Sequence, residues 1–321
     1  MTAYGLGPVP GTDIALAADI IAGETGDSRH LPQLPARGLG SDLIGRTAGL
    51  LEAVTVDRGP RGWRLTNRPQ LATRAMWDRM ERDLDILEEL WSDGVDTLKI
   101  QVVGPWSLAA SLELANGHRA ITDPGALRDL TAALHAGIDE HVEDVKKRFG
   151  SNVIVQLDEP LYADVLAGLR GTTSFDPVRP VPSEVGTDGL EQFNADLLNF
   201  TGQQPNWEAA RAVKTTIIDA ALLGTDQDGI GEHIEEGYRL AFAVNPFAES
   251  GAIKDPRQVS INLAKAWDRI GHSRLRLTTD IDIVSATSGE SLKDMAAAYR
   301  FIAEVADILE RDAGEIGRAH V

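Results

Sequence analysis

The chain of 321 residues contains no cysteine. This absence excludes disulfides, catalytic thiols and metal centres ligated by cysteine thiolate, although it leaves the redox compartment open. No stretch approaches the roughly 18 consecutive apolar residues that a membrane span requires. The N-terminus also lacks the basic segment and apolar core of a secretory signal. A cytoplasmic location without a membrane partner is therefore expected.

Positive charge is also scarce, with 31 Lys and Arg against 49 Asp and Glu and a formal net charge of −18. An acidic surface repels phosphate backbones and anionic lipids, so no nucleic-acid partner is expected. Hydrophobic residues make up 43% of the chain, which is ordinary for a globular protein. Because α/β barrels of about 250 residues or more form one unit, we predict a single domain over residues 1–313 and a poorly ordered tail over 314–321.

Two helices are indicated by their periodicity and their ends. Apolar residues recur at steps of three and four from Pro69 to Trp91, which predicts an amphipathic helix. A second helix is predicted to begin at Pro124, behind the N-cap residue Asp123, and to end at Gly150 after three basic residues.

Short β-branched and apolar runs alternate with helical segments about eight times along the chain. This alternation predicts an α/β fold, a (β/α)8 TIM barrel, with an open doubly wound sheet as the alternative. A long loop over Arg29–Gly40, a β-hairpin over Asp57–Asn67 and a proline-rich connection over Thr172–Gly186 are expected near the ends of the barrel. The predicted strands are Tyr4–Gly7, Leu51–Val56, Leu98–Val103, Val153–Leu157, Leu197–Phe200, Thr215–Ile218, Leu240–Val244 and Leu275–Thr279.

In such a barrel the loops after the carboxyl ends of the strands build the active site. Four of the eight predicted strand ends carry a carboxylate, but Asp and Asn also cap helices and form turns, which explains any single one equally well. The most distinctive is Asp158-Glu159-Pro160, because a buried carboxylate there can hold a substrate ammonium or act as a general base. The candidate catalytic residues are Asp158, Glu159 and Asp219, and the candidate substrate-binding residues are Gly7, Pro8, Trp106, Asp158, Asn199, Thr201, Asn245, Asp280 and Asp282.

The chain has seven histidines, and none of them lies at a predicted strand end. A His-Glu-x-x-His pair, a serine nucleophile elbow and a phosphate-binding loop are all absent from the sequence. Nicotinamide and nucleotide chemistry are therefore not expected, and no metal-ligating residues are predicted.

Four segments taken together resemble the cobalamin-independent methionine synthase family. They are the run Gly5–Asp13, the loop Leu31–Pro35 with the following residues 37–46, the strand and turn over Lys99–Ser107, and Val155–Pro160. More narrowly, they are similar to the short, single-barrel actinobacterial-type members, which match the catalytic C-terminal barrel, and the resemblance covers nearly the whole chain. It implies a barrel shared in outline with uroporphyrinogen decarboxylase. It also implies methyl transfer from a reduced folate to homocysteine, whose thiol is activated on zinc.

The resemblance places the family's zinc ligands at positions that lack thiol and imidazole groups. They fall near Asn199 and Thr201 after the fifth strand, near Asp219 after the sixth and near Ile281 after the eighth. Only the acid is retained, so zinc is expected to be lost, and the remaining oxygen donors suit Mg, Mn or Ca or no metal.

The amino-acid pocket that the resemblance implies is better preserved. Asp158 or Glu159 matches the acid that meets the substrate's amino group in the family, and backbone near Gly7 to Pro10 would meet its carboxylate. A homocysteine-like amino acid is then the expected small-molecule partner, and methyl-folate is the methyl donor that the family uses.

Three functions remain open, and with them whether the protein is an enzyme. The first is a methionine synthase-like methyltransferase with altered chemistry. The second is a metal-free decarboxylase acting on a carboxylated ring, for which Arg37, Arg46 and Arg58 are the evident cations. The third is a non-catalytic barrel that binds an amino acid or another small molecule, since a fold does not fix a function. A homo-oligomer is compatible with all three.

Overall fold

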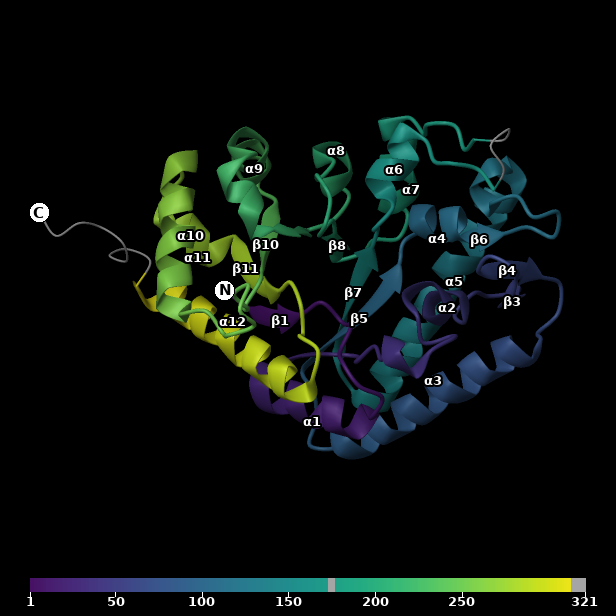
Figure 1. Ribbon diagram of the computed structural model, residues 1–321, viewed down its shortest axis with the longest axis horizontal. Coiled ribbons are helices and arrows are strands. Elements are labelled where there is room, and N and C mark those ends of the chain that lie inside the picture. The colour runs from purple at the N-terminus through teal and green to yellow at the C-terminus, as the bar shows by residue number, and fades with distance from the viewer. Residues whose placement is uncertain (173–176, 313–321) are drawn as a thin grey trace, which may run out of the picture.

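The computed structural model describes residues 1–172 and 177–312, and its central feature is a sheet of eight parallel strands (Figure 1). The sheet curls into a nearly closed barrel surrounded by helices, which confirms the predicted (β/α)8 class. In spatial order the strands are β1 (Ala3–Gly5), β11 (Ile281–Ser285), β10 (Arg239–Val244), β9 (Thr215–Asp219), β8 (Leu197–Asn199), β7 (Asn152–Asp158), β5 (Thr97–Val103) and β2 (Ser28–His30).

The barrel closes between β1 and β2, just beyond the carboxyl ends of both strands. The backbone N–H of Gln33 donates to the carbonyl of Gly7 at 3.0 Å, and the N–H of Val9 donates to the carbonyl of Gln33 at 2.8 Å. Gly7 has a φ of 129°, and a Cβ there would lie 3.0 Å from the side chain of Gln101. Glycine is therefore favoured at this point of closure.

The predicted second strand, Leu51–Val56, is wrong as a barrel strand. Thr55–Arg58 forms β3, which pairs antiparallel with β4 (Trp63–Thr66), and β6 (Leu112–Glu113) adds a third strand to this small separate sheet. The hairpin expected over Asp57–Asn67 is thus present. The true second barrel strand, β2, is only Ser-Arg-His, so it offers no apolar run from which a buried strand could be predicted.

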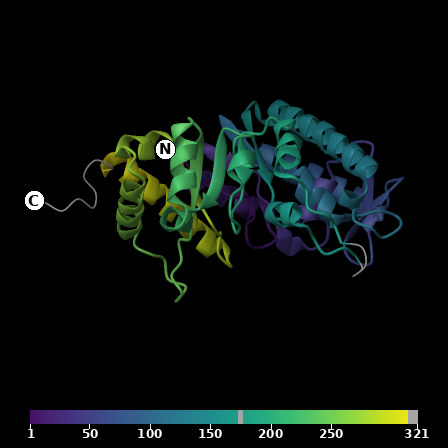
Figure 2. The same cartoon turned by 90° about the horizontal axis from the view of Figure 1, so that it is seen from above.

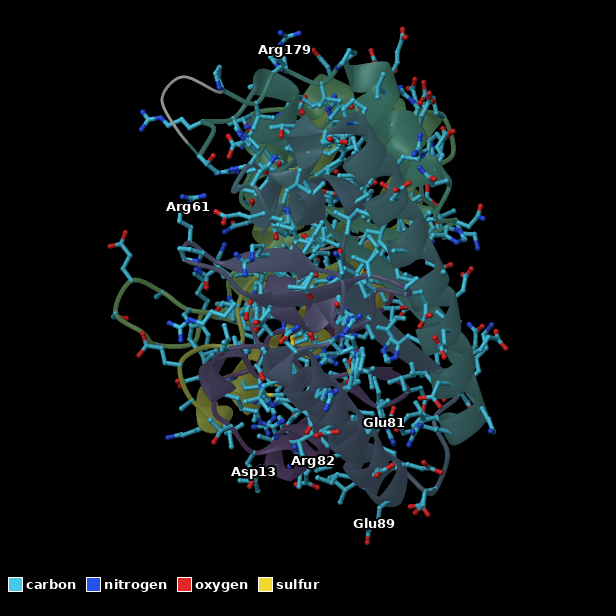
Figure 3. All side chains as sticks on the ribbon, turned by 90° about the vertical axis from the view of Figure 1, so that its right-hand side faces the viewer. Asp13, Arg61, Glu81, Arg82, Glu89 and Arg179 are labelled. Atoms are coloured by element: carbon cyan, nitrogen blue, oxygen red, sulfur yellow. The ribbon has the colours of Figure 1, made fainter. Side chains whose placement is uncertain are left out.

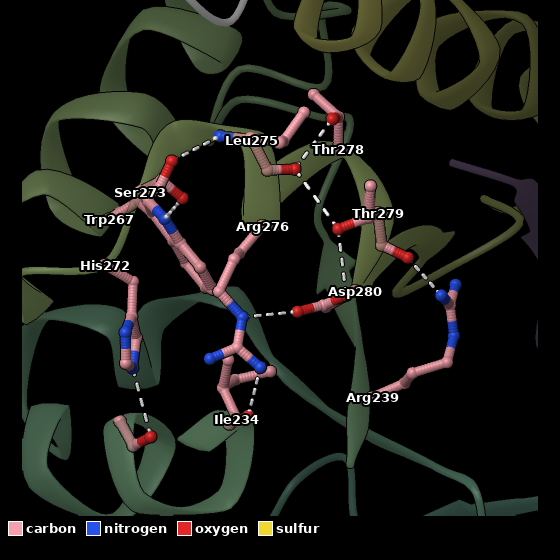
Figure 4. Close-up of polar contacts among 11 residues, drawn as sticks. Ile234, Arg239, Trp267, His272, Ser273, Leu275, Arg276, Thr278, Thr279 and Asp280 are labelled. Atoms are coloured by element: carbon pink, nitrogen blue, oxygen red, sulfur yellow. Dashed lines mark hydrogen bonds and ion pairs between the residues drawn. The ribbon is translucent and has the colours of Figure 1, made fainter. Parts of the chain in front are cut away.

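The predicted last strand, Leu275–Thr279, is also wrong, because these residues lie in helix α11 (Arg274–Thr279) (Figure 4). The hydroxyl of Ser273 caps the helix by accepting from the N–H of Leu275, and Nε of Arg276 donates to Oδ2 of Asp280 at 2.7 Å. The barrel strand follows as β11. Asp280 and Asp282 consequently stand at its beginning and not at its carboxyl end.

The two helices predicted from periodicity are confirmed as α3 (Leu71–Leu90) and α5 (Pro124–Phe149). Oδ1 of Asp123 accepts from the N–H groups of Gly125 and Ala126, which have no backbone acceptor within the helix because they lie in the first turn of α5. Gly150 ends the helix in the left-handed conformation, with its N–H donating to the carbonyl of Lys146.

Helices cover the barrel on all sides, as the two ribbon views show (Figures 1 and 2). Along the lower edge of Figure 1 run α12 (Leu292–Asp312), α1 (Ile14–Thr25) and α3, with α1 packed between the other two. Along its upper edge stand α10 (Pro256–Ile270), α9 (Gln227–Glu235), α8 (Trp207–Ala210), α7 (Ser183–Glu191) and α6 (Tyr162–Ala167). Two further short helices are α2 (Leu43–Ala48) and α4 (Pro105–Ser111), and 3-10 turns lie over Pro35–Arg37, Ala120–Thr122 and Ala220–Gly224.

Within residues 1–172 and 177–312, no helix combines the length and the apolar character needed to cross a membrane. The tail predicted over 314–321 lies outside the described residues, as do residues 173–176 of the predicted connection Thr172–Gly186.

Candidate functional site

A cavity of about 310 Å³ opens at the carboxyl ends of the barrel strands. Residues at or just after the carboxyl ends of β1, β7, β8 and β11 line it, together with one residue each from α2 and α12. Its polar and ionisable residues are Asp158, Glu159, Asn199, Thr201, Ser285, Thr287, Ser288 and Tyr299. We refer to it below as the mouth cavity.

Asp158, the last residue of β7, is buried and lines the mouth cavity. Its Oδ1 accepts from Nε2 of Gln156 at 2.7 Å and from Nδ2 of Asn199 at 2.8 Å. No residue of the described chain donates a hydrogen bond to its other oxygen, Oδ2. A buried carboxylate oxygen that lines a cavity is available to a hydrogen-bond donor on a ligand.

Lys99 on β5 supplies the charge that balances this carboxylate. Its Nζ donates to Oε1 of Gln156 at 2.5 Å and to the carbonyl of Leu6 at 3.4 Å. Burial lowers the pKa of Lys99 to about 7, while the nearby charge of Asp158 raises it. Burial likewise raises the pKa of Asp158, and the hydrogen bonds from Asn199 and Gln156 and the charge of Lys99 lower it. Each group therefore favours the charged form of the other, against the effect of burial.

Glu159 is fully buried and caps helix α4. Its Oε1 accepts from the N–H of Trp106 at 2.9 Å, and its Oε2 accepts from both the N–H and the hydroxyl of Ser107, at 2.9 and 2.6 Å. Burial raises the pKa of Glu159 to about 7 against the effect of these hydrogen bonds. With both oxygens engaged by α4, Glu159 is suited to positioning the loop after β7, and Asp158 is left as the acid that a ligand can reach.

Two further predicted residues organise the loop that follows β8. Oδ1 of Asn199 accepts from the N–H of Thr201 at 3.0 Å, so the Asn199 amide bridges this loop and Asp158. Oδ2 of Asp219, at the end of β9, accepts from the N–H of Gly202 at 2.8 Å. Asn199 and Thr201 line the mouth cavity, whereas Asp219 is not among its lining residues.

The remaining predicted residues from the strand ends differ in their placement. Pro8 lines the mouth cavity, and its carbonyl accepts from the hydroxyl of Ser288 at 2.8 Å, which joins the ends of β1 and β11. Gly7 lies at the closure of the barrel. Trp106 is buried with its Nε1 bonded to the carbonyl of Gly186, and Oδ1 of Asn245 accepts from the N–H of Phe247 in its own turn. Trp106 and Asn245 do not line the cavity.

Asp280 and Asp282 lie at the opposite end of the barrel, so their predicted placement at the mouth is wrong. Oδ1 of Asp282 accepts from the N–H of Thr2 at 2.8 Å, and both its oxygens contact NH2 of Arg239 at 3.2 and 3.1 Å. The misplacement follows from reading α11 as the last strand. The turn that does follow β11, Ala286–Ser288, lies at the mouth and escaped prediction because it carries no charge.

Tyr299 of α12 also reaches the mouth cavity and was not predicted. Its hydroxyl lies 3.2 Å from Nε2 of His30, and the two rings meet edge to face at 5.7 Å. A Cβ on Gly5 would lie 2.3 Å from this hydroxyl and 2.7 Å from Cε1 of His30. Only a glycine in β1 allows this pair to approach the barrel, and no pattern in the sequence indicates such a long-range contact.

The residues at the mouth do not fit the zinc that the family resemblance implies. The positions after β8 and β9 carry an amide, a hydroxyl and a carboxylate in Asn199, Thr201 and Asp219, and the sequence has no cysteine. Among the described residues, no group of three or more His, Cys, Asp or Glu is placed to hold a metal ion. Protein zinc sites depend on sulfur and imidazole donors that are missing from these positions.

The sequence matches no protein-family model and no curated protein. Among solved structures, the chain is similar to a methyltransferase from Methanosarcina mazei, with 14% identity, a TM-score of 0.51 and coverage of 90% of this chain and 83% of that one. It is also similar to a B12-independent methionine synthase from Shewanella sp. W3-18-1 in complex with selenomethionine, with 10% identity, a TM-score of 0.53 and coverage of 97% of both chains. These similarities show a shared barrel fold.

Proposed function

We propose that this protein is a methionine synthase-like barrel that binds an amino acid of the homocysteine and methionine class at its mouth, without the family's zinc chemistry. The observation that carries the proposal is that Asp158 lines a cavity of about 310 Å³, while no described residue donates a hydrogen bond to its Oδ2. A buried carboxylate whose other oxygen is already fixed by two amide donors is well placed to accept hydrogen bonds from an ammonium group.

The turn after β11 provides a complementary place for the ligand's carboxylate. The N–H groups of Thr287 and Ser288 make no hydrogen bond with any described residue, and both residues line the same cavity as Asp158. The hydroxyl of Ser288 donates to the carbonyl of Pro8, which holds the turn in place. Pro8 and Pro10 have no N–H to offer, so this turn supplies the donors that the resemblance assigned to the backbone of Gly7 to Pro10.

Binding is better supported than methyl transfer. Activation of a thiol needs a group that holds the thiolate or removes its proton. Glu159 is engaged by α4, and Asp158 faces the expected ammonium, while the other polar groups of the mouth are hydroxyls and an amide. The decarboxylase alternative also loses support, because Arg37, Arg46 and Arg58 are not among the residues that line the mouth cavity.

Isothermal titration with L-methionine and L-homocysteine tests the proposal. The wild-type protein is expected to bind at least one of them, and Asp158→Asn is expected to weaken binding at least about tenfold, because a neutral amide loses the charge-assisted hydrogen bond to the ammonium. The matched control is Asp19→Asn, an equal change at an exposed position of α1. Absence of binding, or equal loss in both variants, would contradict the proposal, and formation of methionine from homocysteine and methyl-folate would show that the methyl transfer is retained.

A further inference from the structure

A second cavity, of about 390 Å³, lies outside the barrel among α2, α3 and α5, and we refer to it as the helix cavity. Figure 3 faces this side of the molecule and labels Glu81, whose carboxylate pairs with Arg148 of α5 across the gap between α3 and α5. The wall formed by the segment after α2 is closely packed, since a Cβ on Gly137 would lie 1.8 Å from the carbonyl oxygen of Leu50. The N–H of Glu52 donates to the carbonyl of Ala133, which ties the same segment to α5.

Arg46 of α2 lines the helix cavity without a partner of its own. Its guanidinium makes no hydrogen bond or ion pair with any residue in the described parts of the chain. Asp83, the acid whose charge acts on Arg46, is already held by NH1 of Arg37 at 2.7 and 2.8 Å. Burial lowers the pKa of Arg46 to about 10, so it remains a cation at neutral pH. An unpaired guanidinium with limited access to water is a strong site for an anion.

The imidazole of His141 lies in the same cavity and adds no charge to it. His141 projects from α5 and is only 7% exposed. Burial, followed by the charge of Arg46, lowers the pKa of His141 to about 4, so the ring is neutral at pH 7. A neutral imidazole can donate or accept one hydrogen bond to a ligand beside Arg46.

The rest of the cavity limits the ligand to a small, singly charged molecule. Met76, Met80 and Leu84 of α3 supply an apolar wall. Toward the outside, Glu81 and Asp144 pair with Arg148 at 2.5 and 2.9 Å.

A second pair of acids completes the rim. The carboxyl groups of Glu52 and Glu140 are hydrogen-bonded to each other, and this contact raises the pKa of Glu52. Such an acidic rim repels polyanions. Arg79 also lines the cavity, but its NH1 already donates to the carbonyl of Leu39 and to the hydroxyl of Ser41. Arg46 is then the cation left for a ligand, and one carboxylate matches its charge.

We propose that the helix cavity is a binding site for a small monocarboxylate with an apolar body, whose carboxylate pairs with Arg46 and whose apolar part packs on α3. This site is separate from the mouth cavity and does not depend on the function proposed for it. The planar guanidinium fits the two oxygens of a carboxylate.

Calorimetric titration of the full chain at pH 7 with hexanoate, hexanamide and hexyl phosphate tests the proposal. Hexanoate is expected to bind in a 1:1 ratio, at least about tenfold more tightly than the neutral amide or the doubly charged phosphate. Arg46→Met is expected to weaken hexanoate binding at least about tenfold. Arg74→Met, an equal change at an exposed position of α3, and Asp158→Asn at the mouth are expected to leave it unchanged.

Three outcomes would overturn the proposal: no hexanoate binding by the wild-type protein up to about 10 mM, equal binding by Arg46→Met, or loss of binding in Asp158→Asn. If Arg46→Met does not fold, Met80→Phe provides the decisive variant, because it fills the apolar wall while Arg46 stays in place. Retained hexanoate affinity in Met80→Phe would then contradict the proposed position of the ligand.

Discussion

Lys99 and Asp158 are joined inside the barrel through the side-chain amide of Gln156, which accepts from Nζ of Lys99 at 2.5 Å and donates to Oδ1 of Asp158 at 2.7 Å. The three residues lie on neighbouring strands, β5 and β7, with β7 contributing both Gln156 and Asp158. The amide has one donor end and one acceptor end, and each faces the charge that it complements. The hydrogen bond from Gln156 and the charge of Lys99 lower the pKa of Asp158 and so oppose the larger effect of burial, which raises it.

Replacement of Lys99 by Met is therefore expected to weaken binding of L-methionine about tenfold at pH 7. Without the cation, burial raises the pKa of Asp158 further, and a protonated acid attracts the ligand's ammonium less strongly. Titration calorimetry at pH 6, 7 and 8.5 measures the effect. The difference from the wild type is expected to shrink at the highest pH, where wild-type Lys99, with a pKa of about 7, has also lost most of its charge. Lys214→Met, at an exposed lysine, is the control. A loss that is independent of pH would indicate a structural defect instead of an electrostatic role.

Substitution of Glu159 by Gln is expected to destabilise the fold by about 1–3 kcal/mol, the typical effect of leaving buried polar groups unsatisfied. Both carboxylate oxygens accept N–H groups from the first turn of α4, and the amide nitrogen of Gln would face one of those donors. Urea unfolding monitored by circular dichroism gives the difference in free energy of unfolding. Glu184→Gln, at an exposed position in α7, is expected to change it by less than about 0.5 kcal/mol. Equal stability of the two variants would argue against a capping role for Glu159.

A methyl group on Gly5 is expected to be costly, because it would lie 2.3 Å from the Tyr299 hydroxyl. Overpacking of this kind typically destabilises a protein by about 1–3 kcal/mol. Gly23→Ala in helix α1 is the matched control, since no atom lies within 4 Å of its added Cβ. There the gain in helix propensity is expected to stabilise the fold by about 0.5–1 kcal/mol. The melting temperatures of the two variants should thus shift in opposite directions. An unchanged melting temperature in Gly5→Ala would show that the Tyr299–His30 pair does not pack closely against β1.

The sequence predicted those parts of the fold whose signal is local. The apolar stripe of α3 and the caps of α5 at Asp123 and Gly150 lie within the elements they define, and Asp158 is conspicuous because it ends an apolar strand. The strand Ser28–His30 has no apolar run, and it is a strand only because β5 pairs with it. The segment Leu275–Thr279 has too few residues to distinguish helical from strand periodicity, and this error displaced Asp280 and Asp282 to the wrong end of the barrel.

The contacts that the residues of the mouth cavity make with one another could not be predicted from the sequence. Lys99 reads in the sequence as one charge in a hydrophobic strand, and its link to Asp158 depends on the register between β5 and β7. Tyr299 meets His30 across 269 residues of sequence. Side-chain contacts between residues so far apart in the sequence depend on the closure of the barrel, and no spacing pattern along the chain indicates them.

His233 provides a test of how burial controls stability at acidic pH. Its ring is 1% exposed and packs between Trp207 and Tyr238, at centroid distances of 5.2 and 5.0 Å. Burial, the largest cause, lowers the pKa of His233 to about 4 from an ordinary value near 6.5. Between these two values the unfolded chain binds a proton that the folded protein does not. Stability is therefore lost as the pH falls from about 6.5 toward about 4.

His233→Phe keeps an aromatic ring at this position but cannot take up a proton. At pH 7.5 both proteins carry no charge there, so any difference in their free energy of unfolding reports packing and the burial of the two imidazole nitrogens, without a contribution from protonation. At pH 5 the variant is expected to gain on the order of 1–2 kcal/mol relative to the wild type, because only the wild-type unfolded chain is stabilised by protonation at residue 233. Urea unfolding at both pH values measures this change. An unchanged difference between pH 7.5 and pH 5 would mean that His233 takes up its proton equally well in the folded protein, and that its burial among the aromatic rings is incomplete.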